Sequence, residues 1–190
     1  MHLRYLSADG LLADSMDLAI KVYESGFRPD LLVALWRGGT PIGIAMQEAF
    51  EYLGLDCHHF AIRSSSYVGL DKQGAIRLWG MELLQPYVQS NSKVLLVDDV
   101  FDSGRTMQAV INHLHAMTGP HHSDIRLATP WFKPSSNVTS LTPHFFLHET
   151  SDWLVFPHEL QDLSPEQMLA KPGVAPQVQK LLALKKSAGA

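Results

Sequence analysis

The sequence contains little of what several protein classes require. Among its 190 residues there is one cysteine, Cys57, which excludes an internal disulfide framework and a zinc site built from several cysteines. Fifteen Lys and Arg against nineteen Asp and Glu leave a net charge of −4 at pH 7, which disfavours non-specific binding to nucleic acid. No apolar run approaches the roughly 18 residues of a membrane span, and the N-terminus lacks the apolar core of a secretory signal. We therefore expect a soluble, cytoplasmic protein that binds neither nucleic acid nor membrane.

Two common kinds of nucleotide-binding loop are also missing. The sequence contains no Gly-Lys-Ser or Gly-Lys-Thr, which a P-loop requires, and no Gly-x-Gly-x-x-Gly, which opens a dinucleotide-binding unit. What is present is a chain of 21.1 kDa with 46% hydrophobic residues, which is enough for one full folded domain and too short for two comfortable ones.

Apolar residues alternate between helical and strand-like spacing along the chain. The continuous apolar run 31–36 predicts a strand that is buried on both faces, and 93–98 is the clearest strand of this kind. The inner face of the second helix is expected to carry Met46, Ala49, Phe50 and Leu53. The predicted helices cover 12–23, 41–53, 107–117 and 176–186, the predicted strands 31–36, 57–63, 75–80, 93–98, 124–132 and 144–147, and a predicted loop 64–74.

This alternation of strands and helices implies an α/β fold, with a mainly parallel twisted sheet flanked by helices. In such sheets, ligands collect at the carboxyl ends of the strands. The loops after Trp36 and Asp99 are therefore the expected places for a site.

Residues 94–106 carry the most informative pattern. A buried strand ends in Asp98 and Asp99, a short loop with Gly104 and two hydroxyl side chains follows, and then a helix begins. The first turn of a helix offers unpaired backbone N–H groups and a positive dipole end, which together bind phosphate. Two carboxylates would repel that phosphate, so they would face hydroxyl groups or a Mg2+ ion. The alternative is a strand-end acidic pair followed by an ordinary Ser103 N-cap.

The pattern closely resembles the phosphoribosyl-diphosphate signature of the type I phosphoribosyltransferases. The resemblance implies that Asp98 and Asp99 contact the ribose hydroxyls and a Mg2+ ion, directly or through water. It also implies that Asp102 lies beside the incoming base and acts as the catalytic general base. The residues that would hold the 5′-phosphate are Asp102, Ser103, Gly104, Arg105 and Thr106.

Two further segments extend the resemblance around the donor site. Arg37-Gly38 resembles the start of the family's pyrophosphate loop, where glycine amides approach an anion and Arg37 adds a forked set of donors. On its own, a glycine-rich turn between a strand and a helix is usually only a turn. The later serine-rich segment resembles the start of the loop that closes over the site, with Ser65, Ser66 and Tyr67 as lid residues. The alternative for that segment is an ordinary surface loop.

On the base side, Lys133 lies in Trp-Phe-Lys-Pro at the end of a predicted strand. It matches the lysine that donates to the exocyclic oxygen of the purine in the 6-oxopurine branch of the family. Taken alone, a lysine in this position is most often a surface residue whose stem covers apolar groups.

Residues 149–159 resemble the base-binding hood of the microbial hypoxanthine and xanthine-guanine enzymes. The resemblance implies that Trp153 stacks on the base next to Leu154 and Val155, whereas a tryptophan in an apolar stretch is otherwise a core residue. It also makes Glu159 a candidate metal ligand. The microbial pattern Pro-Trp-Asp/Glu is Pro-His-Glu in this chain.

Together, these resemblances imply a type I phosphoribosyltransferase domain over 1–160, with its hood near 144–160, and a helical extension over 161–190. The implied activity is the Mg2+-dependent transfer of 5-phosphoribosyl from phosphoribosyl diphosphate to a 6-oxopurine in purine salvage, by a homodimer or homotetramer. Two alternatives stay open: a non-catalytic regulatory protein that binds phosphoribosyl diphosphate, and a phosphoribosyltransferase for a non-purine acceptor.

Overall fold

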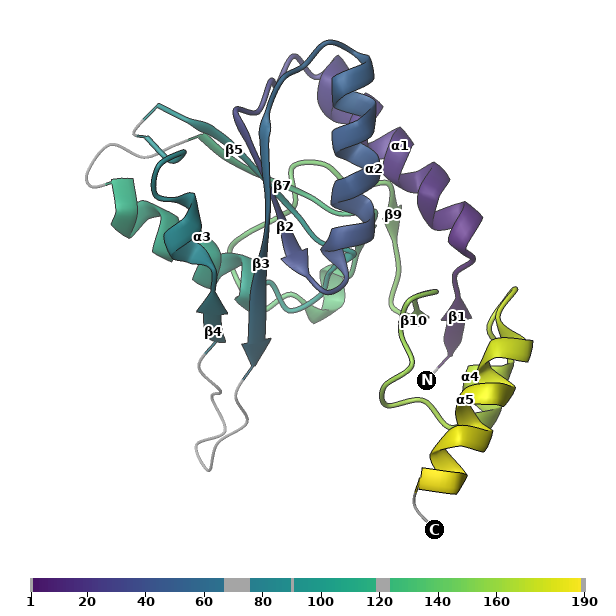
Figure 1. Ribbon diagram of the computed structural model, residues 1–190. Coiled ribbons are helices and arrows are strands. Elements are labelled where there is room, and N and C mark those ends of the chain that lie inside the picture. Colours follow the sequence, from purple (N-terminus) through teal and green to yellow (C-terminus); the bar gives the residue numbers. More distant parts are fainter. Residues whose placement is uncertain (1, 67–75, 90, 119–123, 189–190) are drawn as a thin grey trace. The chain divides into compact units, whose positions relative to one another are not determined.

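The computed structural model describes residues 2–66, 76–89, 91–118 and 124–188 (Figure 1). The chain forms two compact units: Leu12–Ser151, and a smaller unit that joins Met1–Leu11 to Asp152–Ala190. The predicted boundary at residue 160 falls inside the smaller unit. The division into a domain over 1–160 and an extension over 161–190 stays a prediction.

The larger unit is built on a five-stranded sheet. Its strands are β2 (Leu31–Trp36), β3 (His58–Ser66), β4 (Ile76–Trp79), β5 (Lys93–Val97) and β7 (Asp124–Ala128). They lie in the order β4-β3-β2-β5-β7, and all pair in parallel except β4, which is antiparallel to β3. The predicted α/β fold with a mainly parallel sheet is therefore confirmed.

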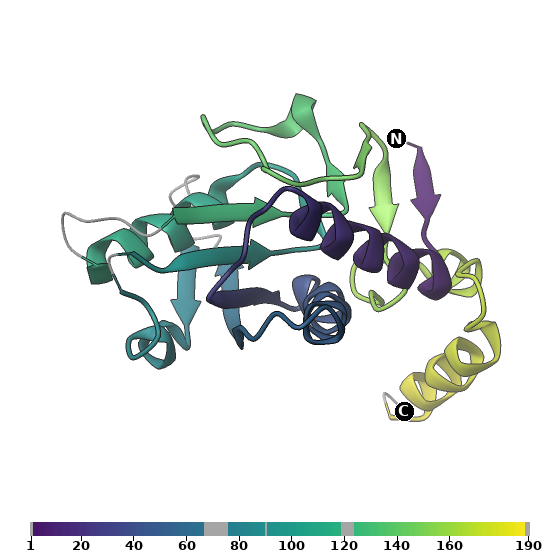
Figure 2. The same ribbon diagram turned by 90° about the horizontal axis from the view of Figure 1, so that it is seen from above.

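Helices cover both faces of this sheet (Figures 1 and 2). The two that bear on the site are α2 (Gly39–Tyr52) and α3 (Arg105–Thr118). Successive side chains of β2 point to opposite faces of the sheet. Leu31, Val33 and Leu35 belong to the core on the α3 side, whereas Leu32 and Ala34 face α2. Burial on both faces explains why a continuous apolar run marked this strand in the sequence.

The structure confirms the inner face predicted for the second helix at Met46 and Phe50, which are buried, but not at Leu53. α1 (Ala8–Glu24) is a helix as its spacing predicts, but Leu12, Met16 and Ile20 lie on its exposed side. Leu53, predicted on the inner face of α2, is the exposed residue that caps its C-terminus. Periodicity groups residues on one face of a helix, but the sheet decides which face it contacts.

The predicted strand over 124–132 is interrupted. β7 ends at Ala128, and the chain passes Pro130, which has no N–H to donate to a ladder. It then enters a second sheet of order β6-β8-β9, in which both pairings are parallel. The strands of this sheet are β6 (Val100–Phe101), β8 (Trp131–Phe132) and β9 (His148–Glu149).

Two other predicted boundaries are wrong. The predicted strand over 144–147 makes the single bridge from Phe145 to Ala128, and the strand β9 begins only at His148. The predicted loop begins too early, because 64–66 continue β3 and pair with β4. Short 3-10 turns, η1 (Met81–Leu84) and η2 (Pro134–Ser136), follow β4 and β8.

In the smaller unit, β1 (Leu3–Tyr5) pairs in parallel with β10 (Trp153–Val155). Two helices follow in this unit, α4 (Pro165–Leu169) and α5 (Ala175–Ala188), so the predicted helix over 176–186 is confirmed. Within the described parts of the chain, every helix is too short or too polar to cross a membrane.

Candidate active site

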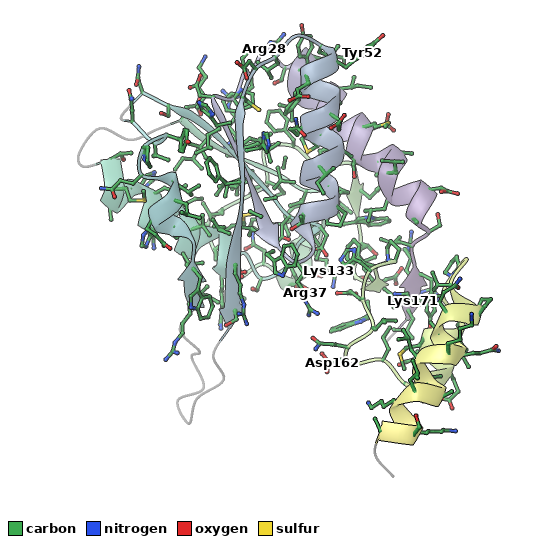
Figure 3. The ribbon with its side chains drawn as sticks, in the orientation of Figure 1. Arg28, Arg37, Tyr52, Lys133, Asp162 and Lys171 are labelled. Carbon is green, nitrogen blue, oxygen red and sulfur yellow. The ribbon has the colours of Figure 1, made fainter. Side chains whose placement is uncertain are left out.

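The ends of two central strands bring the predicted donor loops together. β2 and β5 are parallel neighbours, so Arg37 and Gly38, which follow β2, lie beside Asp98 and Asp99, which follow β5. A Cβ on Gly38 would overlap the Asp99 carboxylate, and this close approach of the two loops requires glycine. The peptide bond between Trp36 and Arg37 is cis. In Figure 3, Arg37 lies at the end of the sheet where β2 ends.

The two adjacent acids have an electrostatic cost that the protein only partly offsets. Removal from water and the charge of Asp99 raise the pKa of the Asp98 carboxyl well above its usual range. Hydrogen bonds from the backbone N–H groups of Asp99, at 3.0 Å, and of Gly39 act in the opposite direction. Asp99 is itself buried. The Asp98 carboxylate is therefore held by two backbone donors.

This pair fits a hard divalent cation. Mg2+ is commonly held by one or two carboxylates together with substrate oxygens and water, and a cation would relieve the repulsion between Asp98 and Asp99. In the described residues no three His, Cys, Asp or Glu side chains cluster as a complete metal cage. The remaining ligands of a Mg2+ ion at this place would therefore come from substrate or water.

The loop between β6 and α3 forms a small pocket at a helix N-terminus. Gly104 adopts a left-handed conformation with φ of 77°, and α3 begins at the next residue, Arg105. The pocket measures about 80 Å³, and its lining residues include Asp98, Asp102, Ser103, Gly104 and Thr106. Two residues with hydroxyl groups and the N-terminus of α3 thus border one cavity, an arrangement suited to phosphate binding.

The segment that supports this loop was missed by sequence reasoning. Val138 N–H donates to the Ser103 carbonyl at 3.1 Å, and Asn137 and Thr139 lie where a Cβ on Gly104 would point. The Thr139 N–H and hydroxyl both donate to Asn137 Oδ1 at 2.9 Å, which closes a local turn. In the sequence, the Asn-x-Thr pattern at 137–139 indicates a turn. It does not indicate that this turn packs against the loop at Ser103 and Gly104.

The second sheet joins the predicted catalytic residue to the predicted base-binding lysine. Because β6 and β8 are paired, Lys133 N–H donates to the Phe101 carbonyl at 2.9 Å, and Asp102 follows Phe101 directly. Lys133 Nζ then donates to Asp102 Oδ2 at 3.0 Å. Lys133 is 7% exposed, which excludes an ordinary surface lysine. Its place in the unit is labelled in Figure 3.

The predicted lid residues are only partly described. Ser65 and Ser66 lie at the end of β3, opposite Arg77 and Ile76 of β4. Tyr67 lies outside the described residues. The lid assignment stays a prediction.

The remaining predicted base-binding residues belong to the smaller unit. Trp153 is 45% exposed, so it is no core residue, whereas Leu154 and Val155 are buried. The side chain of Glu159 accepts a hydrogen bond from Phe156 N–H at 3.2 Å. Glu159 therefore has a local structural contact, and its metal-binding role stays a prediction.

The lone cysteine does not supply a nucleophile. Burial, followed by the charges of Asp56, Glu51 and Asp30, raises the pKa of the Cys57 thiol to about 11. The thiolate is the reactive form, and it is scarce at neutral pH under these conditions.

Comparison with known proteins gives a family match over most of the chain. The model of the phosphoribosyl transferase domain matches residues 3–164. A search of the curated proteins found no match.

Solved structures share the fold. A xanthine-guanine-hypoxanthine phosphoribosyltransferase from Helicobacter pylori is 25% identical, with a TM-score of 0.64 over 82% of this chain and 92% of its own. A purine phosphoribosyltransferase from Pyrococcus horikoshii is 24% identical, with a TM-score of 0.68 over 86% and 99%. A hypothetical protein from Neisseria gonorrhoeae with bound ppGpp is 18% identical, with a TM-score of 0.69 over 97% of each chain.

Proposed function

Because the chain belongs to the phosphoribosyl transferase domain family, whose enzymes are of the glycosyltransferase type, we propose that it transfers 5-phosphoribosyl from phosphoribosyl diphosphate to N9 of a 6-oxopurine. The observation that carries the choice of acceptor is the pair of Lys133 and Asp102, 3.0 Å apart. An ammonium donor beside a carboxylate acceptor complements a purine edge on which O6 accepts and the neighbouring ring nitrogen donates. Hypoxanthine, guanine and xanthine all carry this edge.

The donor would bind along the carboxyl ends of β2 and β5. The 5′-phosphate is proposed to enter the pocket at Gly104, where Ser103, Arg105 and Thr106 surround the start of α3. The ribose hydroxyls would face Asp98 and Asp99. The pyrophosphate would lie against Arg37 and the Gly38 amide, because the two loops meet there.

The reaction would break the bond from C1′ to the pyrophosphate oxygen, with the electron pair leaving on the pyrophosphate, and would form the bond from N9 to C1′. Asp102 is proposed to accept the ring proton of the purine at a carboxylate oxygen. Arg37 would stabilise the charge that develops on the leaving group. Asp98 and Asp99 would hold Mg2+, directly or through water, and the ion supplies charge neutralisation on the pyrophosphate.

The other sequence predictions belong to the same proposal. The Trp153 ring would stack on a purine face, with the backbone at Leu154 and Val155 reading its edge. Ser65, Ser66 and Tyr67 would begin a lid that excludes water during transfer. A cytoplasmic homodimer or homotetramer acting in purine salvage is the setting that we propose for the enzyme.

The proposal is tested by measuring pyrophosphate release from phosphoribosyl diphosphate and Mg2+ with a panel of bases. Release with hypoxanthine, guanine or xanthine, and not with adenine, uracil or orotate, is the expected result. Release with one of the latter bases alone would instead favour the non-purine acceptor. Omission of Mg2+ and addition of chelator is expected to abolish the release.

A nucleotide-binding regulatory protein is the second candidate. The observation that favours it is the match to the Neisseria gonorrhoeae protein with bound ppGpp, which extends over 97% of each chain, whereas the two purine enzymes match 82% and 86% of this one. The phosphates of such a ligand could occupy the same anion-binding loops. No release with any base, together with calorimetric binding of ppGpp, would favour this candidate over the enzyme.

Lys133 is expected to control selectivity for the acceptor. Replacement by Gln removes a charged donor, so kcat/KM for hypoxanthine and guanine should fall about 10- to 100-fold, the loss expected for one charge-assisted hydrogen bond. Lys93→Gln, which alters an exposed lysine on β5, is the control. Unchanged kinetics with both purines would contradict the contact between Lys133 and the base.

A further inference from the structure

The turn that follows β10 is closed by its own backbone and by one distant side chain. Within the turn, Glu159 N–H donates to the Phe156 carbonyl at 3.1 Å, and Phe156 N–H donates to Glu159 Oε2 at 3.2 Å. The His158 ring stacks on the Phe156 ring with 5.6 Å between their centroids. Each of these contacts lies within the smaller unit. Pro-His-Glu thus forms a compact turn here, where the microbial pattern has Pro-Trp-Asp/Glu.

The distant side chain is Lys171, which lies between α4 and α5. Its Nζ donates to the Phe156 carbonyl at 2.6 Å and also to the Glu159 carbonyl. The two carbonyl groups belong to the first and last residues of the turn, so a single ammonium group joins its ends. Lys171 is labelled in Figure 3.

Lys171 is 3% exposed, which is unusual for lysine. Burial lowers the pKa of Lys171, an effect that the charge of Glu159 opposes. A buried ammonium group has a desolvation cost, and the two carbonyl acceptors offset part of it. The preceding helix is fixed at its start by a capping box between Ser164 and Gln167. The lysine is therefore presented from an ordered segment.

The turn lies directly after the strand that carries the predicted base-binding residues. This strand, β10, pairs with β1. Just before β10 begins, Asp152 accepts a hydrogen bond from Arg4 at 3.0 Å. Phe156 is 2% exposed, so the end of the strand is buried as well as bonded. The half-exposed Trp153 ring is thus displayed from a strand that is held at both ends.

We propose that Lys171 is a positioning residue for the purine, acting through the Phe156 and Glu159 carbonyl groups to fix the strand that displays Trp153. The segment beyond residue 160 would then take part in acceptor recognition, although it need not touch the acceptor. The role of Lys171 in purine binding rests on the proposed function. Its role in fixing the turn 156–159 is independent of that function.

The first test is independent of activity and uses the full chain with Lys171→Met. Hydrogen exchange measured by mass spectrometry should become at least about tenfold faster for the amides of 153–159, which include the bonded N–H groups of Phe156 and Glu159. Exchange in α3 should stay unchanged. Lys180→Met, which alters an exposed lysine on α5, is the matched control and should match the wild type. Unchanged exchange over 153–159 would overturn the proposal.

The second test is kinetic. Lys171→Met should raise KM for the purine about tenfold, the loss expected for misplacement of one or two contacts, with KM for phosphoribosyl diphosphate and kcat within about twofold of the wild type. Equal rises in both KM values, or a fall in kcat alone, would indicate general destabilisation and overturn the positioning role. If the wild-type protein transfers phosphoribosyl to no base, the proposed function is contradicted. Faster hydrogen exchange over 153–159 in Lys171→Met would in that case still support the role of Lys171 in fixing the turn.

Discussion

Asp102→Asn should lower kcat about 10²- to 10⁴-fold, the range expected for loss of a general base, with little change in the affinity for phosphoribosyl diphosphate. The asparagine side chain keeps the shape of the aspartate but accepts a proton far less readily. It also loses the charge that pairs with Lys133 at 3.0 Å. Because the substitution leaves Ser103, Gly104 and Thr106 of the pocket unchanged, donor binding should survive it.

The measurement is kcat by pyrophosphate release together with the Kd of phosphoribosyl diphosphate by calorimetry. Asp124→Asn is the matched control, because it also removes a carboxylate with a cationic partner, Arg126, at the start of β7. The control should retain turnover within about twofold, as expected for an exposed ion pair away from the site. Turnover of Asp102→Asn close to the wild type would remove Asp102 from the role of base.

Gly104→Ala should weaken donor binding and destabilise the fold. Its φ of 77° is unfavourable for alanine by about 1–2 kcal/mol. A Cβ there would also lie 2.5 Å from Thr139 Oγ1 and 2.9 Å from the Phe101 ring, so the loop must shift. Such overpacking costs about 1–3 kcal/mol more, and displaced amides would weaken phosphate binding about tenfold or further.

Gly54→Ala provides the matched control for this prediction. Gly54 has nearly the same conformation, with φ of 74°, but nothing lies within 4 Å of its Cβ position. Urea unfolding should therefore show the conformational cost alone for Gly54→Ala, and KM for phosphoribosyl diphosphate should stay unchanged. Equal losses of stability and of donor affinity in the two variants would contradict the close packing described around Gly104.

Local patterns were enough to predict the central strands and the order of strand, loop and helix over 94–106. The run 31–36 coincides with β2, because a strand covered on both faces needs apolar residues throughout. The order of strand, acid pair, Gly104 and helix is contiguous in the chain, so its chemistry can be recognised without knowledge of the tertiary structure.

Local patterns failed where a partner lay far away in the sequence. Leu53, predicted on the inner face of α2, is exposed at the C-terminus of that helix. Ser64 belongs to a strand because β4 pairs with it, and not because of its own propensity. Periodicity and propensity describe one element at a time, whereas burial and strand pairing depend on the neighbouring elements.

The sequence by itself determined the α/β class, the order of strand, loop and helix over 94–106 and the identity of the acids and hydroxyls in that loop. Only the tertiary structure decided that Lys133 pairs with Asp102, that Gly38 meets Asp99, and that Lys171 closes the turn after β10. The reason is physical. Contacts between residues far apart in the chain depend on which strands are neighbours and in which register, and no local pattern of side chains encodes that arrangement.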